Sequence, residues 1–148
     1  MFVPSAKSLL TALNASKSSL DGSGRIEVPA KLLKLLLQIA VASTDFDEEG
    51  YLKNNPDVAK AIERGEIESA RVHYIGFGYF EGRQGAGPEV DEKWYLQKYP
   101  DVATAVRDRK ISSAKDHFHA AGAGEGRSPN GELQDDAQQW KNALKGGS

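Results

Sequence analysis

The chain contains two copies of one sequence segment, and this internal repeat limits the folds that the chain can adopt. Residues 46–83 align with residues 90–127 at a constant offset of about 44 residues, without a gap and with close to half of the positions identical. A period of this size is typical of helical repeat arrays, in which each repeat buries its apolar face against a neighbour. Because such arrays serve mostly as scaffolds and binding surfaces, the repeat predicts architecture more directly than activity.

The composition narrows the classes of protein to which this chain can belong. Its 148 residues carry a formal net charge of −2, with basic and acidic residues interleaved, so no nucleic-acid partner is expected. The absence of cysteine excludes disulfides, thiolate metal sites and cysteine nucleophiles. No apolar run approaches the roughly 20 residues that cross a bilayer, and the first residues lack a secretory signal. We expect a soluble chain, either cytoplasmic or part of a larger surface-associated protein.

The region before the repeats is expected to form a helical hairpin. Apolar residues at helical spacing predict an amphipathic helix over residues 5–20, which ends at the glycine-containing residues 21–24. A second helix is predicted to begin at Pro29 and to run to Val41, with apolar residues almost all round it. Such a helix is normally an interior helix. The alternative is a subunit interface, for which the candidate contact residues are Leu32, Leu35, Leu36 and Ile39.

Each repeat is predicted to contain three short helices, so the expected fold class is all-α. In the first repeat, and at equivalent places in the second, the helices are expected over residues 46–54, 57–64 and 70–80. Prolines fit the first turns, serines the N-caps and glycines the helix ends, at Pro56, Pro100, Ser69, Ser113, Gly82 and Gly126. The expected order is a hairpin, two repeats, and a C-terminal capping helix with its tail, over residues 1–45, 46–83, 90–127 and 131–148.

The C-terminal helix is predicted over residues 132–144. Its apolar residues recur at helical spacing, and they are expected to pack back onto the repeats: Leu133, Ala137, Trp140 and Leu144.

The two copies differ most at two turns and in the third helix. Arg109 replaces Gly65, and Tyr99 replaces Asn55, a residue that is predicted to cap the second helix. In the third helix the second copy has lost bulk, with Ala121, Ala123 and Gly124 in place of Phe77, Tyr79 and Phe80. These differences predict that the two third helices have different surroundings.

The polar residues shared by both copies are explained mostly by helix ends. In the first copy they are Asp47, Glu48, Asp57, Ser69, His73, Glu81 and Arg83. Asp47, Asp57 and Ser69 stand at predicted helix starts, where they cap the helix or favour its dipole. Glu81 and Arg83 flank a glycine that is predicted to end a helix, where they are available to pair with a neighbouring unit. No spacing identifies a nucleophile or an acid–base pair, so no catalytic residue and no cofactor are predicted.

The histidines are candidates for chemistry with a competing structural explanation. His73 and His117 each lie inside a predicted helix, where a histidine is more often partly buried and hydrogen-bonded to a carbonyl or carboxylate than bound to zinc. His117 and His119 point in different directions, and no third ligand is near, so no metal site is predicted. An enzyme that combines one of these histidines with Glu81 or Glu125 is the competing hypothesis.

A loop in the N-terminal region resembles the start of an EF-hand calcium loop. Oxygen-bearing residues fall on ligand positions around Gly24, at Ser19, Asp21, Ser23 and Glu27. Ala30 stands where an EF-hand requires a bidentate glutamate, so a capped turn between two helices explains the loop better. Calcium binding by the segment from Asp21 to Ser23 is left open.

Aromatic residues are numerous for such short helices. Packing in the core is the simplest role for any one of them. Tyr and Trp also combine an apolar face with a polar group, which suits a groove for a protein or a glycan. The candidate contact residues for such a surface are Tyr51, Phe77, Tyr79, Phe80, Trp94 and Tyr95.

Both copies follow the pattern Tyr-Leu-x-x-x-Pro-Asp-Val-Ala-x-Ala, then Ser-Ala-x-x-His-Tyr/Phe, then Gly-x-x-Glu-Gly-Arg. This pattern resembles a tandem bacterial repeat found in secreted or surface proteins and in glycosyltransferase-containing polypeptides. The resemblance implies an accessory module of bacterial origin and transfers no catalytic residue. The function expected is therefore a non-enzymatic module that binds a protein partner or self-associates as a homo-oligomer. The alternative is carbohydrate binding in an exopolysaccharide or cell-surface context.

Overall fold

The computed structural model describes residues 2–22, 24–83 and 87–146. Within these ranges every regular element is helical and no strand is present, which confirms the all-α fold class. Ser23 of the candidate calcium loop, residues 84–86 between the repeats and the last two residues of the predicted tail lie outside the described residues. No helix in the described part of the chain is long and apolar enough to cross a membrane.

The N-terminal segment consists of two short helices instead of the single helix predicted over residues 5–20. The first, α1 (Ala6–Ala12), ends just before Asn14, whose φ is 50°, and the second is α2 (Lys17–Asp21). A left-handed residue turns the backbone out of the helix, and asparagine tolerates this conformation better than most residues. The prediction of one continuous helix is therefore wrong, and neither short helix contains a buried residue.

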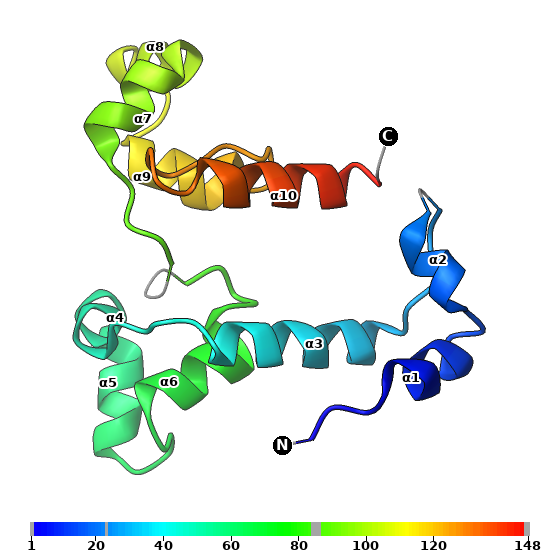
Figure 1. The fold of residues 1–148 in the computed structure, drawn as a ribbon. Coiled ribbons are helices and arrows are strands. Elements are labelled where there is room, and N and C mark those ends of the chain that lie inside the picture. The colour runs from blue at the N-terminus through cyan, green and yellow to red at the C-terminus, as the bar shows by residue number, and fades with distance from the viewer. Residues whose placement is uncertain (1, 23, 84–86, 147–148) are drawn as a thin grey trace.

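The next helix, α3 (Ala30–Ala42), begins after Pro29 as predicted but is not an interior helix. None of its residues is buried. One side of α3 lies against the third helix of the first repeat, where Gln38 Nε2 donates a hydrogen bond to the carbonyl of Ile75 at 3.4 Å. The guanidinium of Arg71 donates to the carbonyl of Ala42 at 2.6 Å, and so satisfies a carbonyl at the C-terminal end of α3. The interior prediction fails because α3 has a packing partner on one side only (Figure 1).

The two repeats fold in the same way, and most of the predicted boundaries are confirmed. Their helices are, in order, α4 (Glu48–Asn54), α5 (Pro56–Glu63) and α6 (Ala70–His73), then α7 (Glu92–Lys98), α8 (Pro100–Arg107) and α9 (Ala114–His117). The Ser69 hydroxyl accepts from the N–H of Val72, and Ser113 makes the equivalent cap. Each cap satisfies a backbone N–H that has no partner inside its helix.

The third helix of each repeat widens into a π-helical turn, which the sequence did not predict. These turns are η1 (Tyr74–Gly78) and η2 (Phe118–Gly122). In η1 the N–H of Tyr79 donates to the carbonyl of Tyr74 at 2.9 Å, five residues back along the chain. Gly82 and Gly126 follow with φ of 71° and 75°, which confirms their predicted role in ending the helix.

Each repeat buries its own small core from equivalent positions. The first core contains Tyr51, Val58, Ala70 and Tyr74, and the second contains Tyr95, Val102, Ala114 and Phe118. Because the tyrosine, valine and alanine come from three different helices, each core joins all three helices of its repeat. Each repeat therefore encloses a separate hydrophobic centre.

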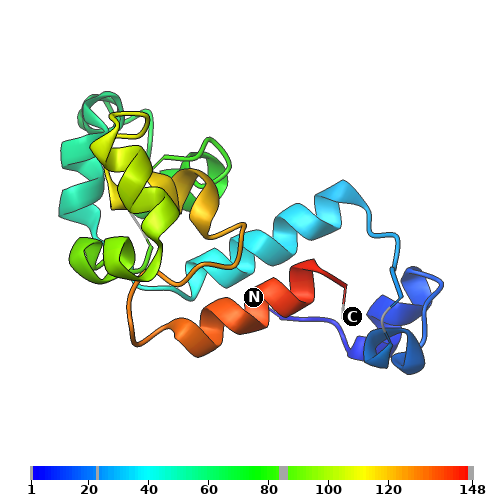
Figure 2. The same ribbon diagram turned by 90° about the horizontal axis from the view of Figure 1, so that it is seen from above.

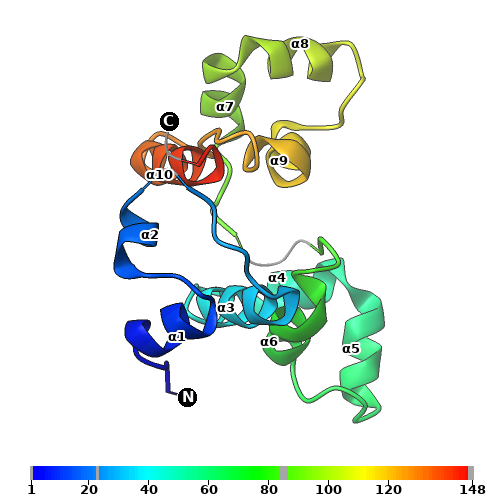
Figure 3. The ribbon, with the colours of Figure 1, turned by 90° about the vertical axis from the view of Figure 1, so that its right-hand side faces the viewer.

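The last helix, α10 (Gln134–Leu144), lies beside the second repeat as α3 lies beside the first (Figure 1). The two helices run in opposite directions, and both extend from the repeats toward the same end of the molecule (Figures 1 and 2). Figure 3 views the molecule from that end, with α3 and α10 at separate levels in front of their repeats. The chain thus has two halves, each made of a repeat and one flanking helix.

Candidate functional site

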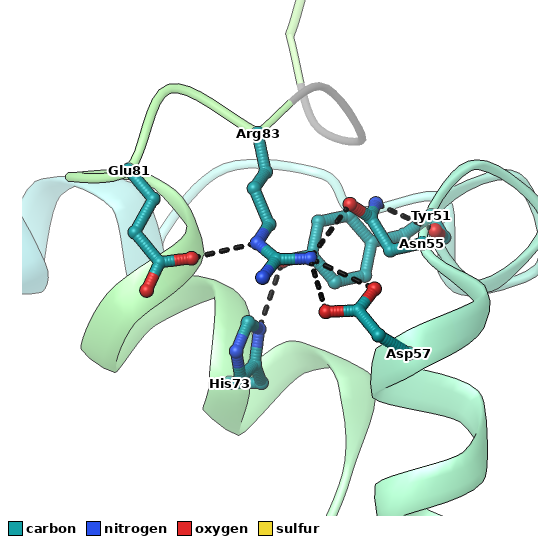
Figure 4. A network of polar contacts seen from close by, with 6 residues as sticks. All are labelled: Tyr51, Asn55, Asp57, His73, Glu81 and Arg83. Carbon is teal, nitrogen blue, oxygen red and sulfur yellow. Dashed lines mark hydrogen bonds and ion pairs between the residues drawn. The ribbon is translucent and has the colours of Figure 1, made fainter.

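A hydrogen-bonded tyrosine–histidine pair lies at the centre of each repeat. In the first repeat the hydroxyl of Tyr51 is hydrogen-bonded to Nδ1 of His73 at 2.9 Å, and both side chains are buried (Figure 4). In the second, Tyr95 and His117 make the same bond at 3.0 Å. The expected hydrogen bond of each histidine is confirmed, although its partner is a hydroxyl group instead of a carbonyl or a carboxylate.

An arginine at the end of each repeat connects the end of the third helix to the start of the second helix of the same repeat. The Arg83 guanidinium contacts both oxygens of Asp57, at 2.8 and 2.9 Å, and the Glu81 carboxylate at 2.6 Å (Figure 4). It also donates to the side-chain oxygen of Asn55 at 3.2 Å. The prediction that Glu81 and Arg83 pair with a neighbouring unit is wrong, because both are held inside their own repeat.

Asn55 occupies the N-cap position of α5, as predicted, without making a side-chain cap hydrogen bond. Its amide nitrogen donates to the carbonyl of Tyr51 at 2.8 Å. This bond uses an unpaired carbonyl at the end of α4 and fixes the corner between α4 and α5.

The second repeat replaces the asparagine with Tyr99 and rearranges the same arginine contact. The Tyr99 hydroxyl accepts from the N–H of Ser128 at 2.8 Å, and its ring lies 4.9 Å from the guanidinium carbon of Arg127. Arg127 meets Asp101 with two parallel hydrogen bonds, at 2.9 and 2.7 Å. Without an asparagine to bind, the arginine is free to form the two-pronged contact that is strongest for this pair.

The protonation states in both repeats follow from these contacts. The hydrogen bond from Arg127 lowers the pKa of Asp101 to about 2, and Arg83 lowers the pKa of Asp57 in the same direction. Burial raises the pKa of Tyr95 to about 12 and also raises that of Tyr51. Near neutral pH the carboxylates are charged and the tyrosines keep their protons. His73 and Glu81 are each held by a different residue, so these groups join helices together within a repeat.

The candidate aromatic residues divide into a buried and an exposed set. Tyr51 and Tyr95 are 0% exposed, so the prediction that they contact a partner or glycan is wrong. Each belongs to the core of its repeat, and Trp94 is partly buried beside Tyr99. The exposed set contains Phe77, Tyr79 and Phe80, all at or just after η1. The structure therefore leaves an aromatic surface on the first repeat alone.

The turn η1, which carries Phe77, packs against α3, a helix with exposed leucines. Leu33, Leu35 and Leu36 are 50%, 44% and 42% exposed, and the candidate residues Leu32 and Ile39 are partly buried. The ammonium group of Lys34 lies 5.0 Å from the ring centre of Phe80, and it connects the two elements. We call the set Leu33, Leu35, Leu36, Phe77 and Phe80 the α3–η1 surface.

A second exposed apolar region lies on α10, and sequence reasoning missed it. The N-cap residue Leu133 and the helix residues Ala137 and Lys141 are partly buried, whereas Trp140 and Leu144 are 63% and 61% exposed. The helix approaches Gly126 so closely that a Cβ there would lie 2.5 Å from the Cβ of Lys141. The expectation that Trp140 and Leu144 pack onto the repeats is wrong, because α10 makes this approach through the aliphatic stem of Lys141. A tryptophan in an otherwise polar helix was the available signal.

The described residues contain no group of three or more histidine, aspartate and glutamate side chains placed to hold a metal ion. The open hollow lined by the candidate calcium loop has residues of α2 on one side and Asn142 and Ala143 of α10 on the other. Burial lowers the pKa of His119, which favours its neutral form.

No family model, no curated protein and no solved structure matches this chain. The exposed apolar surfaces and the repeated polar contacts are therefore the features from which a function is inferred.

Proposed function

We propose that this chain is a non-enzymatic helical repeat module of a bacterial protein, whose role is to bind a protein partner or to self-associate. The observation that carries the proposal is the α3–η1 surface. It consists of exposed large apolar side chains on two elements that pack together, among which Phe77 is 62% exposed. Exposed apolar area costs roughly 25 cal/mol per Å², and clustered exposure of this kind is typical of interaction sites.

The comparison between the two repeats supports the same surface. At the positions of Phe77 and Phe80 the second repeat has Ala121 and Gly124, although the cores of the two repeats are equivalent. The bulky residues are therefore not required by the fold of a repeat. A binding role explains why one repeat carries them on its exterior.

The polar contacts favour a non-enzymatic role. His73 is bound to Tyr51, and Glu81 is bound to Arg83, so the two groups that an acid–base mechanism would require are engaged with different residues. Both sets of contacts occur in each repeat with nearly the same distances. These contacts hold the helices of one repeat together, so folding alone explains why they occur in both copies.

The test of this proposal is the effect of a charge on the α3–η1 surface. Phe77→Glu should abolish self-association in sedimentation equilibrium, or capture of a protein partner from an extract of the source cell, because a desolvated carboxylate is costly. Ala121→Glu is the matched control at the equivalent position of the second repeat. The proposal is wrong if the wild-type chain neither self-associates nor captures a partner. It is also wrong if Phe77→Glu and Ala121→Glu have the same effect.

Carbohydrate binding is the second candidate. Its support is the exposed pair of Tyr79 and Phe80, whose ring centres are 5.1 Å apart and whose planes meet at 85°. Aromatic faces of this kind stack on sugars, and the tyrosine hydroxyl adds a polar contact. Binding on a glycan array that is lost in Tyr79→Ala and retained in Ala123→Ser would favour this role. An array without signal would remove it.

A further inference from the structure

The accessible surface of this chain is larger than that of a compact monomer. It measures 10633 Å², whereas a folded monomer of this mass exposes about 7,400 Å². The excess, on the order of 3,000 Å², is larger than the roughly 1,000–2,500 Å² that each chain loses in a large permanent interface. The extended arrangement of the two halves therefore leaves room for a partner of substantial size.

Such a partner would bury the most apolar area at the exposed apolar residues of the flanking helices. On α3 they include Leu33 and Leu36, and on α10 they are Trp140 and Leu144. Both helices extend toward the same end of the molecule (Figures 1 and 2). Two copies that meet through this end would bring both helices of one chain against both helices of the other.

The charges of the two helices are complementary. Lys31 and Lys34 are the charged residues of α3, whereas the first turn of α10 carries Asp135 and Asp136. Among the described residues, neither Lys31 nor Asp136 takes part in an ion pair. In both helices an exposed apolar residue follows a charged residue by four positions and so lies on the same face, Leu35 after Lys31 and Trp140 after Asp136. The two patterns match when the helices lie side by side in the same direction.

This match requires two chains. Within one chain α3 and α10 run in opposite directions, so a contact between them would place Lys31 beside the end of α10, away from its aspartates (Figure 1). A two-fold axis perpendicular to the helices reverses the direction of the second copy. It brings α10 of that copy parallel to α3 of the first and creates the same contact twice.

We infer that this chain forms a two-fold symmetric dimer in which α10 of a second copy packs in parallel on α3, with Trp140 beside Leu35 and Asp136 beside Lys31. The inference rests on the proposed interaction function and names the occupant of its surface. It also assigns a role to α10, whose exposed tryptophan the fold of one chain leaves uncovered.

The test uses the absence of cysteine from the natural sequence. Leu35→Cys and Trp140→Cys variants of the full chain are mixed under mild oxidation, and the linked species are identified by mass. We expect disulfide-linked dimers that contain one copy of each variant, at a yield at least ten times that of Val72→Cys mixed with Trp140→Cys. Val72 is 48% exposed on α6, a helix that takes no part in the inferred contact, and is the matched control. Lys31→Cys should likewise link to Asp136→Cys and not to Leu144→Cys.

Each other outcome overturns the inference. Leu35→Cys linking mainly to itself would place α3 against α3, which leaves self-association standing but removes α10 as the occupant. A Leu35→Cys/Trp140→Cys double variant that links within a monomer at high dilution would show closure inside one chain. Lys31→Cys linking to Leu144→Cys would show the opposite direction. A monomer at all concentrations that still captures a protein sensitive to Phe77→Glu would overturn the dimer alone, leaving the proposed interaction function intact.

Discussion

The tightest approach in each repeat is between a tyrosine hydroxyl and a glycine of the π-helical turn. A Cβ added to Gly78 would lie 2.1 Å from the hydroxyl oxygen of Tyr51, and one added to Gly122 would lie 2.2 Å from that of Tyr95. Because the same hydroxyl is bound to the histidine one turn earlier, the tyrosine has no room to retreat. Glycine is needed at these positions for the space it leaves, since their backbone is helical.

Gly78→Ala should lower the free energy of unfolding by about 1–3 kcal/mol, because the new methyl group must displace a fully buried ring. Gly76→Ala is the matched control, since nothing lies within 4 Å of a Cβ at Gly76, and it should be neutral or slightly stabilising. Urea unfolding followed by circular dichroism measures both. Adding Tyr51→Phe to Gly78→Ala should recover part of the loss. Equal effects of the two alanines would refute the steric explanation.

The arginine contact of the second repeat predicts a loss of stability in acid. The pKa of Asp101 is about 2 in the folded chain, below the value of about 3.9 in an unfolded one. Its stabilising contribution is therefore fully present above about pH 4 and is lost as the pH falls toward 2. Because Asp101 is largely exposed, we expect less than about 1 kcal/mol. Asp101→Asn should flatten this part of the stability profile in urea titrations between pH 2 and 5, and an unchanged slope would contradict the assignment.

Arg109 is strained where its counterpart Gly65 is not. Both end the second helix of their repeat with a positive φ, 57° for Arg109 and 72° for Gly65. Left-handed backbone costs a residue with a side chain about 1–2 kcal/mol, partly offset by the freedom that glycine adds to the unfolded chain. Arg109→Gly should raise the free energy of unfolding by about 0.5 kcal/mol, and with it the midpoint of thermal unfolding. Gly65→Arg should lower this midpoint. A higher midpoint in Gly65→Arg would contradict the explanation by backbone strain.

At the scale of elements, helix ends were predictable because short-range chemistry fixes them. Pro56, Ser69 and Gly82 occupy their predicted roles, since a proline, a hydroxyl and a glycine each satisfy a local backbone need. The break near Asn14 was not predictable, because several residue types can interrupt a helix. The π-helical turns also escaped prediction, since they widen the helix where Tyr51 from another element packs against Gly78.

The candidate surface was only partly predictable for a related reason. Aromatic composition indicated both Tyr51 and Phe77, yet one is fully buried and the other largely exposed. Their separation depends on which helix covers which side, a property of tertiary packing. The alignment of the two copies held the better signal, because Tyr51 matches Tyr95 whereas Phe77 matches an alanine.

The attachment of α10 can be tested with a pair of equivalent glycines. Gly126→Ala and Gly82→Ala introduce the same left-handed strain, but only at Gly126 does the new Cβ meet another helix, 2.5 Å from Lys141. Gly126→Ala should therefore cost about 1–2 kcal/mol more than Gly82→Ala in urea unfolding. It should also change the fluorescence of Trp140 in the folded state. If both variants lose the same stability, α10 is not held at Gly126.

At the scale of the whole molecule, two separate cores predict two separable unfolding events. Val58 and Val102 are equivalent and almost fully buried, one in each core. Val58→Ala should cost about 2 kcal/mol in the first half, and Val102→Ala the same in the second. Both tryptophans belong to the second half, so the fluorescence midpoint should shift only in Val102→Ala, whereas circular dichroism should change in both. Equal fluorescence shifts would show that the halves unfold together.

The position of the flanking helices bears on how the copy number of this repeat can change. The first repeat receives its flanking helix from the chain before it, and the second receives α10 from the chain after it. An additional copy inserted between them by duplication would have neither helix. Its third helix would be open on the side that α3 covers in the first repeat. Growth of the array would thus add an uncovered face with every inner copy, and two is the largest number of copies for which each repeat has a flanking helix of its own.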